Sequence, residues 1–163
     1  MISNLDKLAR KIIENNQYLT LSTVDDNSNP WISPVVYTYD EDWNFYYVSM
    51  PSSKHSKNIK AHGGVSFAIF DSHQLWGEGV GLQIEATSEI VKLKDIPKVA
   101  KLYAMRKYPY GGINTKIAMN FIKSVVLQNK TYKIYKLIPQ TIWMNDPNSK
   151  IDVRTKINFS MLE

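Results

Sequence analysis

The chain has 163 residues, of which 44% are hydrophobic and 21% charged, and its formal net charge is +5. This length and composition predict one globular domain with its own core and exclude a disordered chain. The absence of cysteine excludes disulfides and cysteine-ligated zinc, and it favours a cytoplasmic protein. No apolar run approaches the roughly 18 residues that span a bilayer, so we expect no membrane partner.

The basic charge comes from lysines that are scattered along the sequence rather than gathered into a stripe or a long run. Nucleic-acid-binding domains usually concentrate Lys and Arg on one face. We therefore expect a solvated basic surface with a local anion site and no nucleic-acid partner. His62 and His73 have no partner at metal-binding spacing, which predicts that the chain has no metal site.

The predicted elements begin with an amphipathic helix at 4–15, where Leu5, Leu8 and Ile12 follow helical spacing. Three strands separated by polar turns come next, at 18–24, 31–39 and 45–50. Pro34 removes a backbone donor from the second strand, so this position is predicted to be an edge or a bulge.

A short helix is predicted at 54–61, capped by Ser52 or Ser53 and ended by Gly63 and Gly64. The remaining elements are strands at 65–70 and 78–92, helices at 95–107 and 114–127, and late strands at 132–138, 140–144 and 151–158. Consecutive antiparallel strands with short connections favour a barrel over a parallel sheet. The predicted class is mainly β, an antiparallel barrel with peripheral helices in a single domain 1–163, its strands within about 17–92 and 131–158.

The segment 49–59 is the most informative for function, because a strand ends there and a helix starts with Lys54 and Lys57 in its first turn. A helix N-terminus offers free backbone N–H groups and the positive end of the dipole, which suits phosphate. Cations at that end are unfavourable unless an anion binds nearby, and Ser53 or Ser56 could add hydroxyl donors. The alternative is an ordinary capped helix with solvated lysines.

The order and spacing of several segments from Tyr18 to Val91 resemble the flavin-binding half of pyridoxamine 5'-phosphate oxidase-like proteins. The matching segments are 18–23 (Tyr-Leu-Thr-Leu-Ser-Thr), 29–31 (Asn-Pro-Trp), 33–35 (Ser-Pro-Val), 45–49 (Phe-Tyr-Tyr-Val-Ser), 54–59 (Lys-His-Ser-Lys-Asn-Ile), 65–72 (Val-Ser-Phe-Ala-Ile-Phe-Asp-Ser) and 79–86 (Gly-Val-Gly-Leu-Gln-Ile-Glu-Ala). The resemblance implies a split β-barrel that forms a homodimer and binds FMN between the two subunits.

By this resemblance, a set of residues on the second strand, the third strand and the loop and helix after it would hold FMN. The isoalloxazine ring would contact Ser33, Pro34, Val35, Val48 and Ser49. The phosphate would be bound by Ser53, Lys54, His55, Ser56, Lys57 and Asn58. Gln83 on the long fifth strand would approach the flavin from the partner subunit.

The chain departs from the vitamin B6 oxidases of this family at three places. Ile32 stands where they carry Arg, Lys54-His55 where they carry Arg-Lys, and Lys150-Ile151-Asp152 where they carry Arg-x-His. These departures argue against oxidation of B6 phosphates but leave flavin binding intact. The resulting prediction is an FMN-dependent oxidoreductase that takes a small-molecule substrate or electron donor, with no assigned substrate and no assigned catalytic residue.

Several alternatives stay open on the sequence alone. The barrel could be a non-catalytic flavin-binding or sensor protein, or a haem- or deazaflavin-using relative, and haem would need His55, His62 or His73 as a ligand. His55 could contact the flavin phosphate or transfer protons, or it could be an exposed first-turn residue. Trp143 could form a wall of the flavin site or pack in the core or a dimer interface.

Overall fold

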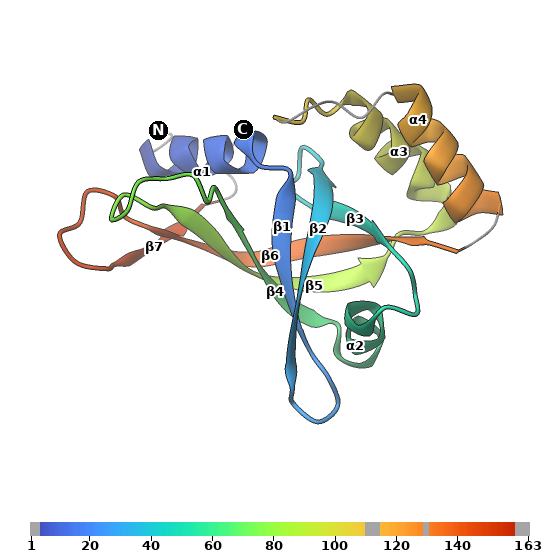
Figure 1. The fold of residues 1–163 in the computed structure, drawn as a ribbon, viewed down its shortest axis with the longest axis horizontal. Helices are drawn as coiled ribbons and strands as arrows, with labels where there is room; N and C mark the ends of the chain where they lie inside the picture. Colours follow the sequence, from blue (N-terminus) through green and yellow to red (C-terminus); the bar gives the residue numbers. More distant parts are fainter. Residues whose placement is uncertain (1–3, 110–114, 129–130, 159–163) are drawn as a thin grey trace.

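The structure is a computed structural model that describes residues 4–109, 115–128 and 131–158. Antiparallel strands form a ring in the order β3-β2-β1-β4-β5-β6, which a β3–β6 pairing closes, and β7 extends the sheet beyond β6 (Figure 1). The predicted antiparallel barrel is therefore confirmed. The strands are β1 (Tyr18–Val24), β2 (Pro30–Tyr39), β3 (Phe45–Ser49), β4 (Gly64–Phe70), β5 (Gly81–Ile90), β6 (Lys133–Asn145) and β7 (Arg154–Ile157).

The barrel interior is filled by one face of each strand, as the alternation of side chains along a strand requires. On β1, Leu19 and Leu21 are buried while Tyr18 on the opposite face is half exposed. Helix α1 (Asn4–Asn15) lies across the barrel and adds Ala9, Ile12 and Ile13 to the same core. The other core side chains include Tyr37, Phe45, Tyr47, Phe67, Ile69, Leu82, Ile84, Leu137, Ile142 and Met144.

A second apolar cluster joins the helices to the outer face of β3 and β6. Helix α3 (Ile96–Met105) follows the short 3-10 turn η1 (Leu93–Asp95), and helix α4 (Thr115–Phe121) continues as a π-helical stretch, η2 (Ile122–Gln128). This cluster consists of Tyr46, Ile96, Val99, Ala100, Tyr103, Tyr108, Ile122, Val126 and Ile134. The helices thus form a second layer beside the strands (Figure 1). In the part of the chain that is described, no helix has the length and apolar character needed to cross a membrane.

Strand β5 begins at Gly81, three residues later than predicted, because the preceding backbone is held by a side chain. The Gln74 amide donates to the carbonyls of Asp71 and Val80 at 2.7 and 2.9 Å, and its oxygen accepts from Val80 N at 2.8 Å. These bonds replace the ladder that Glu78 to Val80 would otherwise make with β4. The β4–β5 pairing starts only at Phe70 opposite Gly81.

The late strands also differ from the prediction, which broke them at Pro139. Residues 133–145 form one strand, β6, and the register against β5 shifts between Glu85 and Ala86, so that Thr141 and Pro139 oppose neighbouring residues. Gln140 is the extra residue of this bulge, and the irregular ladder beside it accommodates a proline, which has no N–H to donate. Strand β7 is shorter than the predicted 151–158, and the single α-helix predicted at 114–127 is α-helical only to Phe121.

The feature of the fold that creates the site is the divergence of β2 from β3. These strands pair only at Tyr37, Thr38 and Tyr39 of β2, whereas β2 pairs with β1 from Pro30 to Val36. Before Tyr37, β2 has no strand partner on its β3 side among the described residues, so Pro34 lies at an edge as predicted. The barrel is therefore split between β2 and β3, and helix α2 (Lys54–His62) follows directly after β3.

The start of β5 offers a test of the fold itself. A methyl group on Gly81 would lie 2.9 Å from Cβ of Phe70 and 3.3 Å from the carbonyl of Ile69. We expect Gly81→Ala to lower the free energy of unfolding by about 1–3 kcal/mol through overpacking, as measured by urea denaturation. Gly79→Ala, whose methyl group meets nothing within 4 Å, is the matched control and should change stability little. Equal stabilities for the two variants would contradict the tight β4–β5 contact.

Candidate cofactor site

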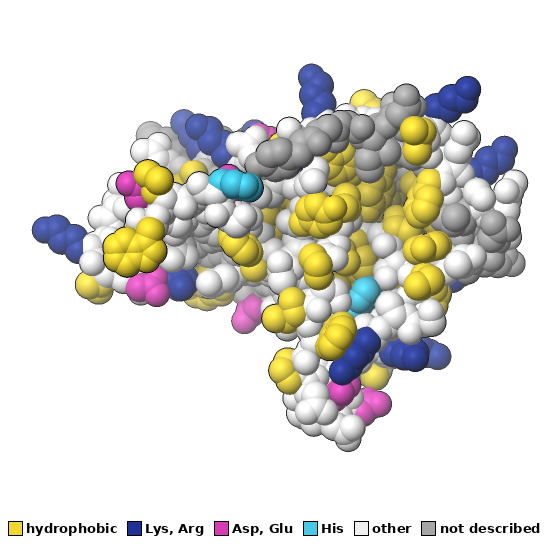
Figure 2. Space-filling view, in the orientation of Figure 1, with side chains coloured by type: hydrophobic (Ala, Val, Ile, Leu, Met, Phe, Trp, Pro, Cys, Tyr) yellow, Lys and Arg dark blue, Asp and Glu magenta, His cyan; other side chains and the backbone are white. Residues whose placement is uncertain are grey.

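A hollow of about 540 Å³ opens where β2 and β3 separate. Pro34, Val35 and Val36 of β2 and Val48 and Ser49 of β3 form its strand wall. The opposite side, which we call the helical wall, is formed by Tyr103, Ile117, Phe121 and Ile122, and the hollow is completed by Tyr18 and His55. Figure 2 shows hydrophobic side chains gathered on this face, with lysines and arginines around the periphery. A hollow of this size is large enough for a drug-sized ligand or cofactor.

The N-terminus of helix α2 lies at one end of the hollow, because His55 belongs to both. Ser53 caps the helix, since its hydroxyl accepts from Ser56 N at 3.4 Å, which confirms one of the two predicted caps. The N–H groups of the first two helical residues, Lys54 and His55, have no acceptor within the helix. They provide a site where an anion can bind.

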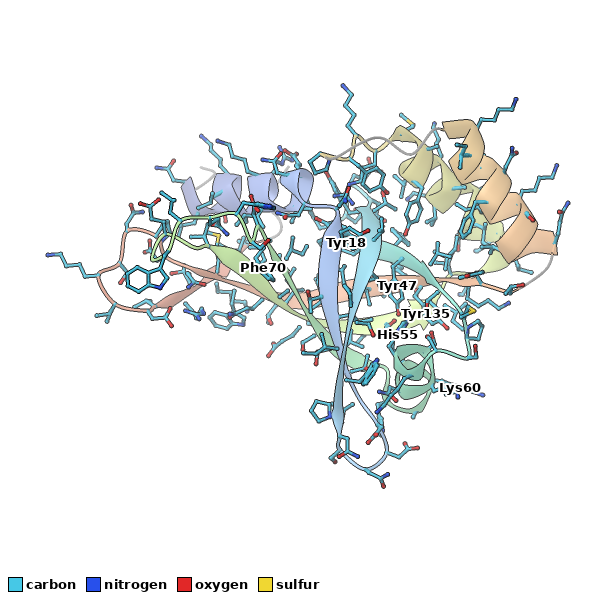
Figure 3. All side chains as sticks on the ribbon, viewed as in Figure 1. Tyr18, Tyr47, His55, Lys60, Phe70 and Tyr135 are labelled. Atoms are coloured by element: carbon cyan, nitrogen blue, oxygen red, sulfur yellow. The ribbon has the colours of Figure 1, made fainter. Side chains whose placement is uncertain are left out.

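His55 is the centre of a buried hydroxyl network. The residue is only 8% exposed, and its ring places Nε2 2.7 Å from Ser49 Oγ and 3.0 Å from Ser53 Oγ, and Nδ1 3.0 Å from Ser33 Oγ. The exposed alternative for His55 is therefore wrong. The ring also lies edge-on to Tyr47, which stacks on Tyr135 (Figure 3). These contacts tie the first turn of α2 to β2 and β3.

The charges at this helix end are unusual, because the first turn contains lysines and no acidic residue. Lys54 Nζ is 3.9 Å from a carboxylate oxygen of Asp25 and lies 4.6 Å from the centre of the Trp31 ring. Lys57 is exposed and forms no ion pair with any described residue. Because a helix N-terminus repels cations, a bound anion would relieve an unfavourable arrangement here.

Not every predicted residue reaches this hollow. Asn58 is buried and donates to Thr23 Oγ1 at 3.0 Å, so its amide fastens α2 to β1 instead of facing the helix N-terminus. Gln83 lines a second hollow of about 370 Å³ on the outer face of β1, β4 and β5, together with Ile32 and Trp143. Trp143 is only partly buried, so it is not a core residue.

The sequence did not assign the helical wall. Tyr103 could line the substrate side or simply pack a helix, because its spacing suits both, and Ile117, Phe121 and Ile122 were not singled out. Arg154, which donates from Nε to the Gln83 oxygen at 3.1 Å and also bonds Asp152, was missed as well. The only signal for Arg154 was an arginine on the last strand.

The hollow fits the two chemically different parts of FMN. Its apolar strand wall suits the faces of a flat tricyclic ring, and the unpaired edge of β2 offers backbone groups to the polar rim of that ring. Ser53, Lys54, His55 N–H and Lys57 would hold the phosphate. Haem fits this hollow less well, because both ring nitrogens of His55 are engaged by serines and neither of the other two histidines lines it.

The burial of His55 has a consequence for stability at acidic pH. Desolvation lowers the pKa of His55 below its ordinary value of about 6.5. The folded protein therefore binds fewer protons than the unfolded chain, and stability must fall as the pH drops below about 6.5 toward the folded-state pKa. We expect chemical denaturation between about pH 8 and about pH 5 to show this loss in the wild type and its absence in His55→Asn.

His62→Gln is the matched control for that measurement, because His62 is exposed and bonded only to Asp26 among described residues. The His62→Gln variant should show the same dependence of the free energy of unfolding on pH as the wild type. An identical pH slope in the wild type and in His55→Asn would show that the imidazole is not held neutral by its surroundings.

The barrel, the split between β2 and β3 and the helix-bounded hollow define a class of cofactor-binding split-barrel proteins. The sequence profile described as Pyridoxamine 5'-phosphate oxidase matches residues 5–136. The chain therefore belongs to the pyridoxamine 5'-phosphate oxidase-like family. No protein with curated information matches the sequence.

Solved structures share the fold at low sequence identity. The heme storage protein HutZ from Vibrio cholerae superposes with a TM-score of 0.68 at 15% identity, covering 86% of this chain and 94% of that one. A heme binding protein from Mycobacterium smegmatis superposes with a TM-score of 0.73 at 12% identity, covering 99% of this chain and 61% of that one. A putative 5-nitroimidazole antibiotic resistance protein from Bacteroides thetaiotaomicron superposes with a TM-score of 0.65 at 13% identity, covering 88% of this chain and 85% of that one. At such identities, the likeness establishes the fold alone.

Proposed function

We propose that this protein binds FMN in the hollow between β2 and β3 and acts as a flavin-dependent oxidoreductase. The observation that carries the proposal is the position of an apolar hollow of about 540 Å³ directly beside a helix N-terminus that carries two lysines and no acid. An uncharged ring and a phosphate need these two environments next to each other. The flavin would supply the redox chemistry, and the protein would supply binding, orientation and electrostatics.

The proposed assembly is a homodimer in which each subunit contributes to both flavin sites. Gln83, whose oxygen Arg154 bonds, lines a hollow on the outer face of the sheet that is separate from the one His55 lines. This side chain can contact a flavin bound beside His55 only if another subunit brings it there. The exposed Ile32 of β2 and Phe70 of β4 supply apolar surface that such an interface would cover.

Oxidation of pyridoxamine phosphate is not the reaction we propose. Ile32, at the position where those oxidases carry Arg, is 61% exposed and brings no cation to the face next to Pro34. A substrate phosphate would need a second anion site of its own, and no cationic side chain lines the hollow among the described residues.

The proposed cytoplasmic setting rests only on the cysteine-free sequence.

Turnover separates an oxidoreductase from a storage or sensor protein with the same cofactor site. We expect FMN-loaded protein to oxidise NADH or NADPH with oxygen or an added acceptor faster than an equal concentration of free FMN. A loaded protein that is no faster than free FMN with either donor would support the non-catalytic alternative. Gel filtration with light scattering at several concentrations should give twice the monomer mass, and a stable monomer that keeps FMN would refute the shared site.

A further inference from the structure

We propose that the helical wall of the hollow selects an uncharged aromatic substrate or electron acceptor and discriminates against anionic ones. This inference rests on the proposed function, because FMN would cover the strand wall and leave the helical wall to the substrate. It deepens that proposal by naming the substrate class.

The first observation is that the hollow contains no charged side chain among the described residues that line it. Four of these residues carry a titratable or hydroxyl group, namely Tyr18, Ser49, His55 and Tyr103, and the last three are already hydrogen-bonded. Ser49 and His55 bond each other at 2.7 Å, and desolvation lowers the pKa of His55, so the imidazole is neutral at neutral pH. An anion placed here would lose its hydration without gaining a partner, which is costly.

Tyr103 contributes a ring but no available hydroxyl. Its OH donates to the carbonyl of Tyr46 at 2.9 Å, and burial raises the pKa of Tyr103 well above 10, the usual value for a tyrosine. The phenol therefore neither ionises nor turns toward a ligand without breaking this bond. The hollow thus offers a substrate apolar contact and no cation.

The second observation is the large apolar side chains that stay exposed around the hollow. Tyr18 is 52% exposed, Ile117 65% and Phe121 44%, although all three line a concave site. Tyr18 stands at the start of β1 at the edge of this face (Figure 3). Aromatic faces exposed over a hollow favour a flat apolar ligand that stacks on them.

On the Gln83 surface, which the proposed partner would bring to the flavin, Arg154 is bonded to Asp152 and to the Gln83 oxygen. Lys54 and Lys57 lie on the first turn of α2, where they would be neutralised by the phosphate of FMN. A bound substrate anion would therefore find no free cation in the hollow.

The test uses a matched pair of ligands, menadione and 1,4-naphthoquinone-2-sulfonate, which share a flat quinone ring and differ in charge. Isothermal titration of FMN-loaded protein should give a dissociation constant at least about tenfold lower for menadione than for the sulfonate. The chain has no cysteine, so neither quinone can form a thiol adduct with it. Oxidised FMN does not react with either ligand, so binding is measured without turnover.

A cation placed on the helical wall should reverse the selectivity. Ile117→Lys should tighten binding of the sulfonate by about tenfold and weaken binding of menadione, because it adds the missing counter-charge. Met119→Lys adds the same charge to the same helix at an exposed residue that does not line the hollow, and it should leave both constants unchanged.

Each outcome has one meaning. Equal affinities, tighter binding of the sulfonate to the wild type, or no binding of either quinone by FMN-loaded protein would overturn the substrate class and leave FMN binding intact. The same effect of Ile117→Lys and Met119→Lys would also overturn it, because the selectivity would then come from overall charge. A protein that retains no FMN would refute the proposed function and this inference with it.

Discussion

Replacing both lysines of the first turn of α2 should weaken FMN binding by at least about 100-fold, because each charge-assisted contact to a phosphate contributes about 1.5–3 kcal/mol. The Lys54→Ala/Lys57→Ala variant should bind riboflavin, which lacks the phosphate, as tightly as the wild type does. Quenching of flavin fluorescence during titration measures both affinities. The FMN-to-riboflavin ratio therefore reports the phosphate contact by itself.

The matched control is Lys60→Ala, a lysine in the last turn of the same helix, where a cation suits the dipole. Lys60 lies on α2 away from the hollow in Figure 3, and its loss should leave FMN affinity unchanged. Removing Lys54 and Lys57 should change the stability of the FMN-free protein little, since relief of two cations at the helix N-terminus offsets the loss of the Lys54 contacts with Asp25 and Trp31. Parallel losses of FMN and riboflavin affinity would mean that the phosphate binds elsewhere.

The largest expected effect on stability comes from Arg106, at the end of α3. Its guanidinium donates to the carbonyls of Tyr37, Ile13 and Asn16, and it lies 4.1 Å from the centre of the Tyr37 ring and 4.8 Å from that of Tyr108. Arg106→Ala would leave three partly buried carbonyls without this donor and remove a stacked cation. We expect the free energy of unfolding to fall by about 3 kcal/mol, measured by urea denaturation.

Arg106→Lys keeps the charge but not the planar fork, so it should recover only part of the loss. Lys107→Ala, at the exposed neighbouring residue, is the control and should cost little. Because α3 also contributes Tyr103 to the helical wall, Arg106→Ala should displace this wall of the hollow as well as lower the stability of the fold. A loss below about 1 kcal/mol would show that these bonds do not anchor α3 to α1 and β2.

The barrel could be predicted from the sequence because its local signals agree with one another. Alternating residues such as Leu19 and Leu21 are bounded by polar turns, and Ser53 and Gly63 mark the two ends of α2, where Gly63 has a φ of +71°. The start of β5 could not be predicted, because the alternating glycines before it read as strand. Only the distant amide of Gln74 diverts that backbone.

The site was predictable only where it is continuous in the sequence. The serines and lysines around Lys54 and His55 predicted the helix start as an anion site. The structure places Pro34, Val35, Val48 and Ser49 beside His55 in the same hollow. The helical wall is formed by residues about 50 to 70 positions after His55, whose spacing is that of any packed helix. The turn of Asn58 toward Thr23 depends on tertiary packing between α2 and β1, which no local pattern reveals.

The most direct test of the account is the visible absorption spectrum of the protein after FMN is added and the mixture is passed through a desalting column. The account predicts that flavin bands near about 370 and about 450 nm elute with the protein, as expected for a retained isoalloxazine. A colourless protein fraction, with all the FMN delayed on the column, would contradict the proposed cofactor site.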